Sequence, residues 1–73
     1  MQTLTFNTTT KEVKLLDGHR GKSEVLETFI NVSTVKCTEL GFYEVMQKLD
    51  PELYTALPVM RVPISNTNMI IEK

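Results

Sequence analysis

Polar and apolar side chains alternate one by one through most of the first sixteen residues, and this alternation predicts β-structure. Residues 2–7 alternate in this way, and residues 11–16 do so again. Successive side chains of a strand point to opposite faces, so each segment presents one apolar face. Thr8-Thr9-Thr10 connects the segments. We therefore expect an antiparallel hairpin whose buried residues are Leu4, Phe6, Val13 and Leu15.

The 73 residues suffice for one small domain, which we expect to span residues 1–73. A domain of this size buries only about 60–65% of the surface of its unfolded chain, so its core must be thin. Cys37 is the single cysteine, which excludes an intrachain disulfide, and we expect it to be buried as a small apolar residue. One cysteine and one histidine are too few for a structural zinc site without carboxylates or a second subunit. We expect neither a metal nor a cofactor.

Residues 24–38 leave two secondary structures open. Leu26, Phe29 and Ile30 keep helical spacing, and Ser23 could cap a helix that ends near Asn31. However, the segment from Thr28 to Thr38 is crowded with β-branched residues, which lose rotamer freedom in a helix and pack well on a sheet. We favour one long strand over the helix.

The period of the apolar residues changes after Thr38. Phe42, Val45, Met46 and Leu49 fall at i, i+3, i+4 and i+7, which is the pattern of one apolar helical face. Thr38 is a suitable N-cap. We expect the main helix over residues 38–49, followed by a short helical turn over residues 51–57 that begins at Pro51.

The last fifteen residues predict a second hairpin, with strands at 59–64 and 69–73 joined by Ser65-Asn66-Thr67-Asn68. Pro63 cannot donate a ladder hydrogen bond, which places its strand at a sheet edge or a bulge. The expected fold class is α+β: a small antiparallel sheet of four to five strands, in the order β-β-β-α-β-β, with one main helix packed on one face.

Net charge argues against bulk attraction to nucleic acid or to anionic lipid. Eight Lys/Arg and nine Asp/Glu give a formal charge of −1, and the cations are dispersed. The longest apolar run, Met69 to Ile71, is far shorter than the roughly 20 residues that span a membrane, and no signal sequence follows Met1. We expect a cytoplasmic protein that does not bind membranes.

The segment Asp17-Gly18-His19-Arg20-Gly21-Lys22 gathers the sole histidine, two cations and two of the three glycines. Its glycines allow close backbone approach, and Arg20 offers a bidentate fork, so it could hold a phosphate or a carboxylate. The alternative is a solvated connection, because the spacing matches no phosphate-binding fingerprint. A catalytic role for His19 would need a partner group that the sequence does not supply. We therefore expect no enzyme.

Protein binding is the function that remains best supported. Tyr, Met and Arg are enriched at interface cores. In general character the chain resembles small single-domain proteins, many of them from bacterial viruses, that inhibit or redirect a larger host enzyme such as RNA polymerase or a nuclease by occluding a surface. A small RNA- or DNA-binding domain using the loop Asp17–Lys22 is the alternative, and a homodimer through the terminal strand is a further expectation. The candidate partner-binding residues are His19, Arg20, Lys22, Tyr43, Tyr54, Met60, Arg61 and Met69.

Overall fold

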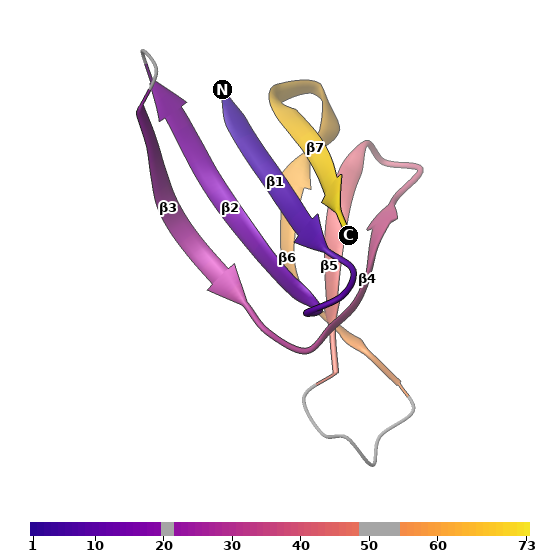
Figure 1. Cartoon of the computed structure of the whole chain (residues 1–73). Coiled ribbons are helices and arrows are strands. Elements are labelled where there is room, and N and C mark those ends of the chain that lie inside the picture. Colours follow the sequence, from indigo (N-terminus) through magenta and orange to yellow (C-terminus); the bar gives the residue numbers. More distant parts are fainter. Residues whose placement is uncertain (20–21, 49–54) are drawn as a thin grey trace.

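The computed structural model describes residues 1–19, 22–48 and 55–73, without the side chains of His19 and Lys22. These residues form seven strands in two sheets, with one short 3-10 turn and no α-helix (Figure 1). The first sheet has the strand order β3-β2-β1-β7, and the second has the order β4-β5-β6. The strands are β1 Gln2–Asn7, β2 Glu12–His19, β3 Lys22–Phe29, β4 Val32–Cys37, β5 Phe42–Gln47, β6 Leu57–Pro63 and β7 Thr67–Glu72, and the 3-10 turn η1 spans Ile64–Asn66.

The N-terminal hairpin is confirmed. β1 and β2 pair antiparallel, from Gln2 opposite Asp17 to Asn7 opposite Glu12. The connection works without an Asn-Gly turn because the Asn7 side chain organises it: Oδ1 accepts hydrogen bonds from Thr9 N at 2.9 Å and Thr10 N at 3.0 Å. Its four predicted core residues, Leu4, Phe6, Val13 and Leu15, are all buried.

The predicted loop 17–22 is shorter than expected. β2 runs on to His19 and β3 begins at Lys22, and these two residues lie opposite each other in the antiparallel register. Asp17 and Gly18 therefore belong to a strand, while residues 20–21 lie outside the described residues. β2 and β3 therefore include four of the six residues of the segment 17–22.

The expected single strand over residues 24–38 is two strands in different sheets. β3 ends at Phe29 and β4 begins at Val32, and between them Asn31 adopts a left-handed conformation with φ 56°. Val32 N then donates a hydrogen bond to Lys11 O at 2.9 Å. Asparagine tolerates this conformation better than most residues, so it supplies the corner where the chain passes from one sheet to the other.

The expected main helix over residues 38–49 is wrong. A turn and strand β5 occupy the described part of this range. Val45 faces the core, whereas Met46 is buried without belonging to the core cluster that contains Val45. Because β5 has apolar residues on both faces, their spacing in the sequence resembles that of one apolar helical face. The predicted helical turn at 51–57 lies largely outside the described residues, and Leu57 begins β6.

The expected C-terminal hairpin is also wrong. β6 pairs antiparallel with β5, whereas β7 pairs in parallel with β1, from Gln2 opposite Thr67 to Asn7 opposite Glu72. η1 carries the chain from one sheet to the other. Pro63 does lie on an outer strand, as its missing N–H predicted.

The core lies between the two sheets and draws on both. Leu4 and Val13 of the first sheet and Val32 and Val45 of the second are almost completely buried, and they belong to one apolar cluster. Two sheets that pack face to face bury one side of each, so a separate helical layer is not required. The predicted α+β class is therefore corrected to an all-β arrangement of two sheets, with one parallel pair of strands.

Candidate protein-binding face

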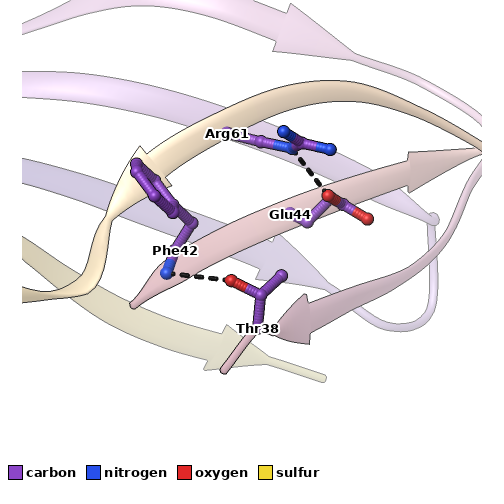
Figure 2. A network of polar contacts seen from close by, with 4 residues as sticks. All are labelled: Thr38, Phe42, Glu44 and Arg61. Carbon is purple, nitrogen blue, oxygen red and sulfur yellow. Dashed lines mark hydrogen bonds and ion pairs between the residues drawn. The ribbon is translucent and has the colours of Figure 1, made fainter. Parts of the chain in front are cut away.

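A tight turn joins β4 to β5. Thr38 N donates a hydrogen bond to Phe42 O at 2.8 Å, and Gly41 N donates to Thr38 O at 3.1 Å. Gly41 has φ 89°, a backbone conformation that residues with a side chain rarely adopt, so glycine fits this place in a three-residue hairpin loop. Thr38, which was expected to cap a helix, instead closes this hairpin turn: its Oγ1 accepts a hydrogen bond from Phe42 N at 3.2 Å (Figure 2).

The same turn is also hydrogen-bonded to η1, which follows β6 directly. Ile64 N donates a hydrogen bond to Gly41 O at 3.0 Å. The turn is thus fixed by bonds within itself and by one bond to η1. At its tip, Leu40 is 85% exposed. Because hydrogen bonds already fix the backbone of this turn, binding of Leu40 in an apolar pocket would cost little additional backbone entropy.

An ion pair lies beside this turn, on the face of the second sheet that points away from the core. Arg61 Nε donates to Glu44 Oε2 at 2.7 Å, across the register of β5 and β6 (Figure 2). The Glu44 side chain is 14% exposed and the Arg61 side chain 62% exposed. Glu44 therefore orients Arg61 through one N–H of its guanidinium group, while more than half of the Arg61 side chain stays accessible to solvent.

Two further residues extend this face. Phe42 precedes Glu44 by two residues on β5, so both side chains lie on one side of the strand, and Figure 2 shows Phe42 beside the ion pair. Lys36 of β4 stands opposite Glu44 in the register. We use the name turn face for these four residues, Lys36, Phe42, Glu44 and Arg61, together with Leu40 of the adjoining turn.

The structure separates the residues that the sequence singled out as partner-binding candidates. Tyr43, Met60 and Met69 are partly buried and pack against the core. Arg61 alone of the described candidates belongs to the turn face. Arg20 and Tyr54 lie outside the described residues, as do the side chains of His19 and Lys22.

Sequence reasoning missed Leu40 and Phe42 because the helical interpretation made them part of a first helical turn. Gly41 was the available signal: between a β-branched segment and an apolar one, a glycine fits a hairpin turn at least as well as a helix. Cys37, which was expected to be buried, is exposed near the end of β4.

Among residues 1–19, 22–48 and 55–73, no three His, Cys, Asp or Glu side chains gather in a way that could hold a metal ion. A shallow open pocket does lie at the seam of the two sheets, lined by Thr10, Lys11, Asn31, Val32, Ser33 and Lys48. No helix within the described ranges is long and apolar enough to cross a membrane.

Comparison with protein-family models, with curated proteins and with solved structures finds no match to this chain.

Proposed function

We propose that this chain is a non-enzymatic protein-binding module that attaches to a larger protein, such as a host or cellular enzyme, through the turn face. The observation that carries this proposal is the ordered, exposed Leu40 turn beside the Arg61–Glu44 pair. Leu40 supplies an apolar anchor, and Arg61 supplies a donor fork that is already oriented. Aromatic residues and arginine are enriched at interface cores, and a few such residues carry most of the binding energy.

The chemistry of the turn face defines the partner that it fits. A pocket for one aliphatic side chain would take Leu40, and a carboxylate or carbonyl oxygen next to that pocket would accept from Arg61. Lys36 at the margin favours an acidic rim. Binding of this kind blocks a surface of the partner and requires no reaction by the chain itself, which suits a regulator or an inhibitor.

The test compares the proteins captured from a bacterial lysate by the wild-type chain and by the Leu40→Asp variant. We expect the wild type to retain a specific protein after nuclease treatment. Leu40→Asp should weaken that binding by about thirtyfold, the equivalent of about 2 kcal/mol for an interface anchor. Leu57→Asp is the matched control, because Leu57 is also exposed but lies at the opposite end of β6 from the turn.

Two results would contradict the proposal. One is retention of the same protein by the wild type and by Leu40→Asp with equal affinity, when circular dichroism shows both chains folded. The other is loss of all captured material on nuclease treatment, which would favour nucleic-acid binding through phosphate contacts.

A further inference from the structure

The outer strands of the two sheets differ in how well they resist pairing with another strand. An outer strand presents unpaired N–H and C=O groups, and proteins protect such edges with prolines, bulges and charges. In β6, Pro58 and Pro63 each lack an N–H. In β4, the register is irregular between Val32 and Thr34, and Lys36 adds a charge.

β3 is protected in a similar way. Leu15 stands opposite Glu27 and Leu16 opposite Val25, so Leu26 is an extra, bulged residue on the outer strand. Glu24 and Glu27 add two negative charges to the same strand. A second copy of β3 that paired antiparallel with these central residues aligned would bring acidic residues close to each other.

β7 is the described outer strand that has none of these devices. Its six residues contain no proline or glycine, and their register with β1 is continuous. The only charged residue, Glu72, is at its end. Ile70 is 47% exposed and Ile71 55% exposed. A regular, weakly charged outer strand with exposed β-branched residues favours pairing with another strand.

The hydrogen bonds of β7 show which peptide groups are available for such pairing. Thr8 N donates to Glu72 O at 2.9 Å, so the N–H and C=O of Glu72 point toward β1. Peptide groups alternate in direction along a strand. Those of Met69 and Ile71 therefore point away from β1, toward the outer edge.

We propose that two copies of the chain associate through β7, paired antiparallel about a two-fold axis at Ile70. In this register, Met69 and the partner's Ile71 exchange both of their N–H···O=C bonds, and the two-fold axis repeats the exchange. Ile70 stands opposite the partner's Ile70 in a pair without hydrogen bonds, where side chains approach most closely. Each exposed isoleucine then gains a cross-strand neighbour from the partner, which shields one flank of its side chain.

The charges of β7 are compatible with this register. Glu72 lies opposite the partner's Asn68, and Lys73 lies opposite the partner's Thr67, so no like charges meet directly. The two four-stranded sheets join into one continuous sheet. The turn face belongs to the other sheet, so this proposal and the proposed function stand or fall separately.

Sedimentation equilibrium of the purified chain over a range of concentrations tests the proposal. We expect a monomer–dimer equilibrium that Ile70→Lys weakens by at least about tenfold, because two lysines would then face each other across the axis. Ile30→Lys is the matched control, an exposed isoleucine outside β7, and it should leave the equilibrium unchanged. A wild-type chain that stays monomeric at millimolar concentration, or equal effects of the two variants, would overturn the proposal.

Disulfide trapping tests the register itself. In a Cys37→Ser background, Ile70→Cys should form a cross-linked dimer under mild oxidation, because facing residues in a pair without hydrogen bonds have Cα atoms about 4.5 Å apart. Asn68→Cys should not cross-link, because it faces the partner's residue 72. Cross-linking at residue 68 but not at residue 70 would overturn the proposed register, and so would its absence at both positions.

Discussion

Among the residues that the structure describes, three with left-handed backbone conformations lie at corners of the fold. Lys11 has φ 61° at the end of the β1–β2 turn, Asn31 has φ 56° between the sheets, and Gly41 has φ 89° in the turn face. Left-handed conformations cost side-chain-bearing residues roughly 1–2 kcal/mol. Lys11 itself, and Asn31 next to Val32, lie at the hydrogen bond from Val32 N to Lys11 O, which joins the β1–β2 turn to the start of β4. The backbone strain of these two residues thus occurs at a long-range contact.

Gly41→Ala should lower the free energy of unfolding by about 1–2 kcal/mol. A Cβ atom at Gly41 would meet nothing within 4 Å, so the whole effect should come from the backbone conformation. Gly18→Ala is the matched control: its Cβ would make an ordinary contact of 3.8 Å with Met1 O, and its φ is not in the left-handed region. Urea unfolding measures both variants. Equal stability of Gly41→Ala and the wild type would show that the turn does not need glycine.

At the scale of elements, local alternation predicted the N-terminal hairpin and its four core residues, because one face of each strand is buried and the other is polar. The same reasoning failed for β5, because Val45 and Met46 are both buried on a single strand. It also failed for β7, because the parallel partner β1 lies at the other end of the chain and leaves no local signature. Of the turn-face residues, residue type singled out only Arg61 as a partner-binding candidate. The others are brought together by the β4–β5 hairpin, which the sequence did not predict.

Met46→Ala should lower the free energy of unfolding by about 2–4 kcal/mol, because Met46 is buried even though it lies outside the main core cluster. Leu57→Ala should cost much less, since Leu57 is 48% exposed. Thermal or urea unfolding distinguishes these outcomes. A change below about 0.5 kcal/mol for Met46→Ala would mean that the second face of β5 contributes no packing.

At the scale of the whole molecule, the thin core and the two sheets give a scaffold whose chemistry is on its surface. The first sheet ends in the unprotected strand β7, and the second sheet carries the turn face. Sequence composition had drawn attention to the segment 17–22 instead. The described ends of that segment, His19 and Lys22, are paired strand residues, and our proposal places the partner-binding surface at the Leu40 turn.

The most direct test of this account compares two variants of the full chain for retention of the same captured protein partner. Leu40→Asp alters the turn face, and the double variant Arg20→Ser/Lys22→Ser alters the segment 17–22. The account predicts that Leu40→Asp loses most of the binding while the double variant keeps affinity close to that of the wild type. Retained binding by Leu40→Asp together with lost binding by the double variant would contradict the central claim and return the function to the cationic segment.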